Sequence, residues 1–309
     1  MFKPFLVHTP VTPFKGDHAI DYDTYAKVLE FHLTNGAGTL ALPMPEGEDM
    51  SLTDPEQRRL IEFAIRQVGG RVPVIVHASD AGTALAAERA VHAEKAGAAA
   101  IVSHPPYFWH PKPAMVVEHL VRIGSAVGLP FFIANPPVET AGTSLTTEIV
   151  LKLIDRLPNL AGVVDASLDW VFMEETISNG RNVRGEFQLL AGAEFPVSSS
   201  AVGGSGLFSP LAGIAPRLIR RLAELCREEK YVAARPLQEE IAGLHHAVRE
   251  AGSSKLKDGL AGIKAAMAYM GRDCGLPRPP VRPLGQSERA RFEEALGRME
   301  FLKEEPRGW

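Results

Sequence analysis

Short apolar runs alternate with amphipathic segments from Phe5 to Glu229. Each run is continuously apolar, which is typical of strands that are buried on both faces in a parallel sheet. The segments between the runs carry apolar residues at helical spacing, as Tyr25, Val28 and Leu29 do. The predicted strands are residues 5–11, 38–44, 72–77, 99–104, 129–135, 160–165, 187–191 and 206–209.

The strand–helix pattern repeats about eight times at intervals of about 30 residues, which is the length of one βα unit. No Gly-x-Gly-x-x-Gly sequence follows the first predicted strand, so an open doubly wound sheet that binds a dinucleotide lacks its best indicator. Chains of about 250 residues commonly form a single barrel. The pattern therefore predicts an α/β fold, a (β/α)8 TIM barrel.

The pattern changes after Glu229. Residues 232–249, 255–270 and 287–303 are predicted to be helical with no strand between them, and a proline-rich stretch at 276–284 separates the last two. We therefore expect a barrel at 1–229 and a C-terminal three-helix extension at 230–309.

Composition and charge narrow the classes of function. A hydrophobic content of 45% is ordinary for a folded protein, and a net charge of −4 with a pI near 6.2 offers no basic surface for nucleic acid or membrane. No signal-peptide pattern and no apolar run of about 18 residues is present, so a cytoplasmic protein with a small-molecule substrate is expected. The two cysteines, Cys226 and Cys274, have no metal-ligand spacing.

Residues 160–167 read Leu-Ala-Gly-Val-Val-Asp-Ala-Ser, a buried strand that ends in an acid and a hydroxyl. Gly162, Asp165 and Ser167 resemble the Gly-x-Lys-Asp-x-Ser motif of the dihydrodipicolinate synthase and N-acetylneuraminate lyase family of barrel aldolases. Similar motifs of that family are matched by Gly47-Glu48, Pro106-Tyr107-Phe108, Asn135-Pro136 and the glycine-rich residues 203–209. The resemblance implies the same barrel and a homotetramer or dimer built on the aromatic loop near Tyr107.

The lysine of this motif forms a Schiff base with a 2-keto acid in the family, and here Val164 stands in its place. Valine has no amine and cannot attack a carbonyl. The resemblance also implies that other chemical groups are replaced. Pro45 and Glu46 align with two threonines, Ala134 with a proton-relaying tyrosine and Glu139 with an arginine. Schiff-base aldolase chemistry is therefore not expected.

In this fold the side chains at the carboxyl ends of the strands face the active site. The candidate catalytic residues there are His77, His104, Glu46, Glu48 and Asp165. The candidate substrate-binding residues are His8, Tyr107, Phe108, Asn135, Glu139, Val164, Ser167 and Glu194. Imidazoles and carboxylates that converge from neighbouring strands can act as an acid–base set, or hold a divalent metal if His77 and His104 lie within about 8 Å.

Each of these residues also has a structural interpretation. A single histidine at a strand end commonly serves as a hydrogen-bonded structural residue, Glu48 could pin a loop, and Asp165 could be retained for loop hydrogen bonds. The sequence thus leaves two functions open. One is a lyase or hydratase-type enzyme acting on a small oxygenated, sugar-like or keto-acid-like substrate without a covalent imine. The other is a non-catalytic ligand-binding pseudoenzyme of the same fold.

Overall fold

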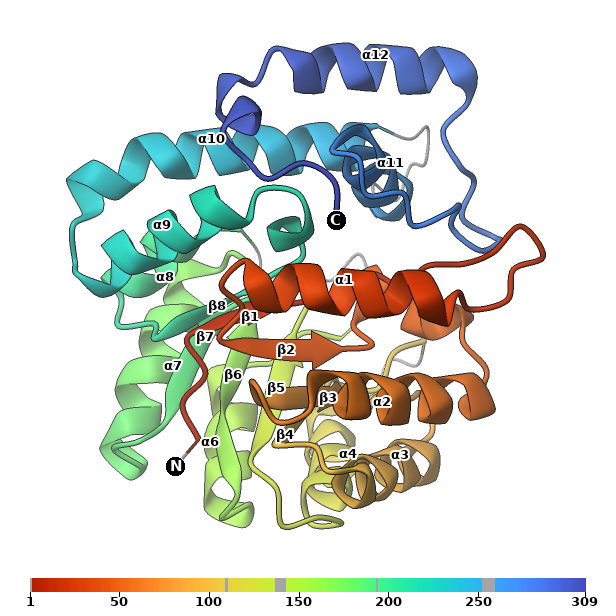
Figure 1. Cartoon of the computed structure of the whole chain (residues 1–309). Helices are drawn as coiled ribbons and strands as arrows, with labels where there is room; N and C mark the ends of the chain where they lie inside the picture. The colour runs from red at the N-terminus through yellow and green to blue at the C-terminus, as the bar shows by residue number, and fades with distance from the viewer. Residues whose placement is uncertain (1, 109–110, 137–142, 193, 252–258) are drawn as a thin grey trace.

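Eight parallel strands close into a barrel in the order β1 to β8, with helices around it (Figure 1), so the predicted (β/α)8 barrel is confirmed. The computed structural model describes residues 2–108, 111–136, 143–192, 194–251 and 259–309. The strands are β1 (Leu6–His8), β2 (Thr39–Leu42), β3 (Val74–His77), β4 (Ala100–Ser103), β5 (Phe131–Asn135), β6 (Leu160–Asp165), β7 (Gln188–Ala191) and β8 (Gly206–Ser209). The helices of the barrel are α1 (Tyr22–Thr34), α2 (Asp54–Val68), α3 (Thr83–Ala96), α4 (Pro113–Gly124), α6 (Thr147–Arg156), α7 (Trp170–Val183), α8 (Pro196–Ala201) and α9 (Pro216–Arg227).

Successive residues of a regular strand point to opposite faces, and the packing divides them accordingly; β6 shifts register once, so that Ala161 and Val164 both face the lumen. Val7, Ile75, Val102, Phe132 and Val164 belong to a cluster inside the barrel. Their strand neighbours, including Leu6, Val76, Ile101, Ile133 and Val163, pack in the larger core between the strands and the helices. The parity of a residue, meaning its odd or even place along the strand, therefore decides whether its side chain reaches the lumen or the helix layer.

Six of the eight strands are shorter than the sequence predicts, and β1 and β2 lose the most at their carboxyl ends. The first ends at His8 rather than residue 11, and the second ends at Leu42 rather than residue 44. Pro10 and Pro43 follow within two residues of these ends, and a proline has no N–H to continue a strand ladder.

Three α-helices follow the barrel within the described residues of the C-terminal extension, as predicted: α10 (Tyr231–Glu250), α11 (Leu260–Tyr269) and α12 (Gln286–Gly297). Helix α10 packs against α8 and α9, and α12 lies outermost, over α10 and α11 (Figure 1). The prediction of one helix over 287–303 is wrong, because α12 ends at Gly297 and a separate 3₁₀ turn covers Glu300–Lys303. Glycine has a low helix propensity, which favours the break there. The first residues of the predicted helix 255–270 lie outside the described residues.

No helix in the described ranges has the length and apolarity needed to span a bilayer.

The close approach of β6 and β7 leaves no room for a side chain at Gly162. A Cβ added there would lie 2.4 Å from the carbonyl oxygen of Gln188. We expect Gly162→Ala to lower the free energy of unfolding by about 1–3 kcal/mol, because the barrel wall must open to relieve the overlap. Urea denaturation measures the loss. Gly185→Ala is the control, since its added Cβ meets nothing within 4 Å; equal losses in the two variants would contradict the steric explanation.

Candidate functional site

The carboxyl ends of β3 and β4 bring His77 and His104 together. His77 shares the parity of Ile75, and His104 that of Val102, so both lie on the lumen side of the wall. Their ring centroids are 4.6 Å apart, with 58° between the ring planes. His77 is only 3% exposed, whereas His104 is half-buried. The predicted convergence of the two imidazoles is thus present in the structure.

Both ring nitrogens of His77 have partners. Nδ1 lies 3.2 Å from Oδ2 of Asp49, and Nε2 lies 2.7 Å from the hydroxyl oxygen of Ser79. The backbone N–H of His104 donates to the same hydroxyl oxygen at 2.8 Å. Asp49 follows Glu48 in the segment after β2, and Ser79 shares the parity of His77 two residues beyond β3. The result is a buried chain of hydrogen bonds, Asp49–His77–Ser79.

Charge and burial set opposite pKa shifts in this group. Burial alone would raise the pKa of Asp49, but the hydrogen bond and the charge of His77, with His104, lower it overall. Burial lowers the pKa of His104 to about 3, and the neighbouring His77 adds to the effect. Near neutral pH, Asp49 is therefore an anion and His104 is a neutral imidazole, which offers one donor and one acceptor nitrogen.

Glu46 stands beside this chain in the 3₁₀ turn η1 (Pro45–Gly47), where its side chain is half-buried. Burial raises the pKa of Glu46, and the negative charge of Asp49 raises it further, while His77 opposes the shift. A carboxyl group of raised pKa can take up and release a proton near the working pH.

Glu194, which follows β7, is a second buried carboxyl, 1% exposed. Its Oε1 accepts from the hydroxyl of Ser209 at 2.8 Å and from the backbone N–H of Leu211 at 3.2 Å, whereas its Oε2 has no hydrogen-bond partner. Burial raises the pKa of Glu194 to about 7; the two hydrogen bonds oppose the shift and the charge of Glu46 adds to it.

The expectation that His8 lies at the mouth of the barrel is wrong. His8 follows the lumen residue Val7, so its side chain faces the helix layer, where its Nδ1 lies 3.1 Å from Nδ1 of His32 in α1. Burial lowers the pKa of His8 to about 3. This position fits the structural interpretation of a histidine at a strand end.

Asp165 and Asn135 also have helix-side parity, and they form a cluster separate from His77. Asn135 Nδ2 donates to Asp165 at 2.7 Å, the hydroxyl of Ser167 donates to the same oxygen at 2.9 Å, and the N–H of Leu145 donates to Asn135 Oδ1 at 2.9 Å. Burial raises the pKa of Asp165 despite these bonds. The cluster ties the ends of β5 and β6 to the following loops, so the structure places Asp165 in loop hydrogen bonding and not beside the two histidines.

Glu48 likewise makes its contacts away from the histidines. Its Oε1 lies 2.5 Å from Nζ of Lys264 in α11, and its Oε2 accepts from the backbone N–H of Arg278 at 2.8 Å. The interpretation of Glu48 as a residue that pins a loop fits these contacts better than a catalytic role.

The remaining predicted residues are distributed as follows. Tyr107 is half-buried. Burial raises its pKa to about 12, and the negative charges of Asp80 and Asp49 contribute to the shift. Phe108 is 81% exposed. Val164 lies in the apolar cluster of the lumen, and Glu139 lies outside the described residues.

The hypothesis of a divalent metal held by His77 and His104 is not supported by the donors around them. The rings are near enough to share an ion, but both nitrogens of His77 are engaged by Asp49 and Ser79. Within the described part of the chain, no three histidine, cysteine or acidic side chains group as metal ligands.

Sequence reasoning missed Asp49 and Ser79. The period-2 rule could have found Ser79, because it follows His77 by two residues on the same face. Nothing distinguishes Asp49 from its neighbours in sequence, since only the two tight turns after β2 decide which of Glu46, Glu48 and Asp49 faces His77.

The order Asp49–His77–Ser79 is that of a catalytic triad, in which a carboxylate orients an imidazole and the imidazole activates a hydroxyl. All three side chains are buried, however, while Glu46, His104 and Tyr107 are partly accessible. The hydrogen-bond chain holds the backbone of His104 through Ser79, and the partly accessible Glu46 interacts electrostatically with Asp49 and His77.

Comparison with known proteins gives one consistent relationship. The model of the dihydrodipicolinate synthetase family matches residues 4–299. Proteins named 4-hydroxy-tetrahydrodipicolinate synthase from Bartonella tribocorum and Methylobacterium radiotolerans are 31% and 32% identical to this chain; the alignments cover 95% and 93% of this chain and 97% and 92% of those proteins. A prophage protein of the dihydrodipicolinic acid synthase family from E. coli K12, solved with pyruvate, superposes with a TM-score of 0.89 at 23% identity, covering 97% of this chain and 99% of that one.

Glu194 predicts a pH dependence of stability. Its pKa is raised from 4.5 to about 7 in the folded protein. Because the folded state binds the proton more tightly, stability falls as the pH rises from the ordinary pKa through about 7. The side chain of Glu194→Gln stays neutral at every pH. Between about pH 5 and about pH 8 we therefore expect its free energy of unfolding to fall by about 2–3 kcal/mol less than that of the unsubstituted protein. Urea unfolding at both pH values measures the difference, and the exposed Glu174→Gln is the control. Identical pH profiles for all three proteins would contradict the assignment.

Proposed function

Because the chain belongs to the dihydrodipicolinate synthetase family, we propose that it is a divergent member, a lyase or hydratase-type enzyme that works without a Schiff-base lysine. Its substrate is a small oxygenated molecule, sugar-like or keto-acid-like. The observation that carries this proposal is the contact of His77 and His104, with Asp49 and Glu46 beside them, at the carboxyl ends of the barrel strands.

The apolar wall of the lumen argues against a covalent imine. Val164 and Ala134 pack there with Val102 and Phe208, and neither side chain can form or protonate an imine. Lys264 is buried, and its amine is paired with the carboxylate of Glu48.

The accessible groups suit proton transfer at carbon. The Glu46 carboxylate removes a proton from the carbon beside a carbonyl, and the neutral His104 imidazole donates a hydrogen bond to the carbonyl oxygen as negative charge develops on it. Protonated Glu46 then gives the proton to a hydroxyl on the next carbon, which leaves as water. In a lyase reaction Glu46 instead removes the proton of that hydroxyl, the bond between the two carbons breaks to give an aldehyde and an enolate, and protonated Glu46 returns the proton to the enolate carbon. Asp49 and Ser79 hold His77, and His77 lies against His104.

The carboxylates also bear on the substrate. Glu46, Asp49 and Glu194 give the mouth a negative character, which disfavours a free carboxylate and favours a neutral, hydroxylated substrate over an anionic one.

We further propose a barrel at 1–229 with an extension at 230–309, and a homodimer or homotetramer built on the loop that carries Tyr107 and the exposed Phe108. The alternative function is a ligand-binding pseudoenzyme, which the burial of His77 and Ser79 would suit.

The absence of an amine at position 164 predicts the result of imine trapping. Pyruvate with borohydride should leave the protein mass unchanged, because none of the described lumen residues carries an amine that could form an imine for borohydride to reduce. Intact-mass spectrometry measures this. A stoichiometric adduct on any lysine of the barrel would overturn the non-covalent mechanism.

Proton transfer at carbon predicts deuterium exchange in D₂O, followed by ¹H NMR with pyruvate and with dihydroxyacetone as probes. We expect exchange to be faster with neutral dihydroxyacetone than with pyruvate. Glu46→Gln should slow it by about 10²–10⁴-fold and His104→Gln by about 10²–10³-fold.

His92→Gln, on the outer helix α3, is the matched control and should exchange at the unsubstituted rate. Binding of a probe by the unsubstituted protein without any exchange would favour the pseudoenzyme instead.

A further inference from the structure

The C-terminal extension reaches the mouth of the barrel at Glu48. This residue links the two 3₁₀ turns η1 and η2 (Asp49–Ser51), and its backbone is left-handed, with φ of 58°. A non-glycine residue rarely adopts this conformation unless its surroundings hold it there. Glu46 and Asp49, which contribute to the site, lie on either side of it.

Lys264 supplies one of the contacts that hold Glu48. The ion pair between them spans 2.5 Å, and the two side chains are 3% and 1% exposed. Burial lowers the pKa of Lys264, and the charge of Glu48 opposes this shift. The ammonium group also lies 4.3 Å from the ring centroid of Phe14 and donates to the carbonyl of Leu276 at 3.3 Å. Both charges of this buried pair are therefore compensated by contacts within the protein.

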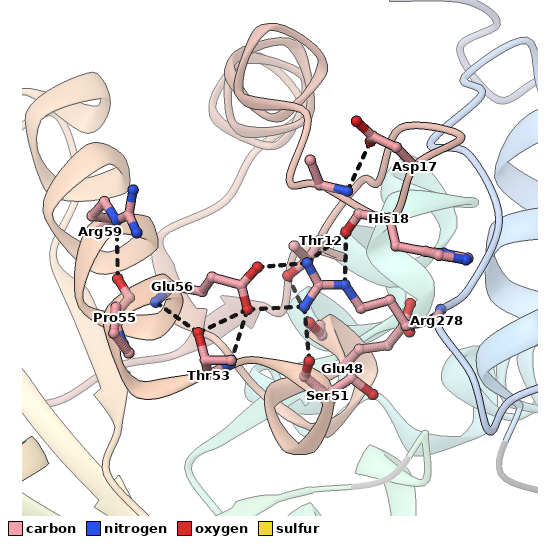
Figure 2. Close-up of polar contacts among 12 residues, drawn as sticks. Thr12, Asp17, His18, Glu48, Ser51, Thr53, Pro55, Glu56, Arg59 and Arg278 are labelled. Atoms are coloured by element: carbon pink, nitrogen blue, oxygen red, sulfur yellow. Dashed lines mark hydrogen bonds and ion pairs between the residues drawn. The ribbon is translucent and has the colours of Figure 1, made fainter.

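Arg278 supplies the second set of contacts, shown in Figure 2. Its backbone N–H donates to Glu48, and its guanidinium donates to the carbonyl of Ser51 at 2.8 Å and to both carboxylate oxygens of Glu56 at 2.6 and 3.0 Å. The same group donates to the carbonyl of His18 at 2.6 Å. The residue thus joins the extension to the loop after β1 and to the start of α2.

The backbone on either side of Glu48 is held by the barrel itself. The hydroxyl of Thr12 donates to the carbonyl of Gly47 at 2.6 Å, and the side chain of Gln57 donates to the carbonyl of Asp49 at 3.0 Å. Neither contact fixes the side chain of Glu48. Its position depends on Lys264 and on the backbone of Arg278, both of which come from the extension.

We propose that Lys264 and Arg278 are positioning residues of the barrel-mouth site. By holding Glu48 in its left-handed conformation, they direct Asp49 toward His77 and keep Glu46 beside that pair. The extension would then be part of the working site, although it contributes no group that touches the substrate. This inference rests on the site of the proposed function, but the contact it concerns is observable without any substrate.

The test reads the Asp49–His77 contact directly, by ¹H–¹⁵N NMR of the full-length protein labelled on histidine nitrogens. The difference spectrum of His77→Gln assigns the His77 signals, and Asp49→Asn gives their positions when the carboxylate is neutral. We expect Lys264→Met, which leaves the Glu48 carboxylate buried without its cation, to shift the Nδ1 signal of His77 toward the Asp49→Asn position. The protected Nδ1–H signal should weaken or be lost through faster exchange with water.

Leu296→Ala is the control for a general loss of stability, because it removes a buried side chain of α12 that has no part in these contacts. It should lower the melting temperature and leave the His77 signals in place. Unchanged His77 signals in Lys264→Met, with a lower melting temperature, would overturn the proposal and leave the ion pair a purely structural one.

Arg278→Leu is a second, independent test in case Lys264→Met does not fold. It keeps both contacts to Glu48 but removes the guanidinium contact to the carbonyl of Ser51, which ends the 3₁₀ turn that carries Asp49. We expect a smaller shift in the same direction, and no shift would overturn the role of Arg278. Deuterium exchange with dihydroxyacetone is measured on the same variants. Because the His77 signal is read without substrate, a failure of the proposed function leaves this test intact.

Discussion

The alternation of side chains along each strand is the constraint on which the rest of the structure depends. A closed parallel barrel has a lumen side and a helix side, and one residue of difference in position moves a side chain from one to the other. His77 follows Ile75 by two residues and faces the lumen, whereas His8 follows Val7 by one and packs against His32. Two histidines at strand ends thus have unrelated environments.

The same constraint sorts the carboxylates. Asp165 has helix-side parity and binds Asn135 and Ser167, so its charge serves the loops of β5 and β6. Asp49 and Glu46 come from turns after β2, where parity no longer applies and the local backbone decides direction. The chemistry proposed here therefore depends on a short irregular segment rather than on the strands.

Buried charge explains why that segment needs support from elsewhere. A carboxylate without a partner in a protein interior is costly, and each one here has a specific solution. Asp49 meets His77, Glu48 meets Lys264, and Glu194 keeps its proton more readily than an exposed glutamate would. The helical extension supplies the cation for one of the three, which ties its packing to the geometry of the barrel mouth.

The sequence by itself predicted the barrel, the helical extension and the convergence of His77 and His104, because periodicity identifies the strands and consecutive strands of a barrel are neighbours. It also showed that Val164 offers no amine. Only the tertiary structure decided that Asp49 and not Glu48 contacts His77, and that Glu48 forms its ion pair with Lys264. These contacts depend on the geometry of two tight turns and on the packing of a helix, and no periodic pattern in the sequence encodes either.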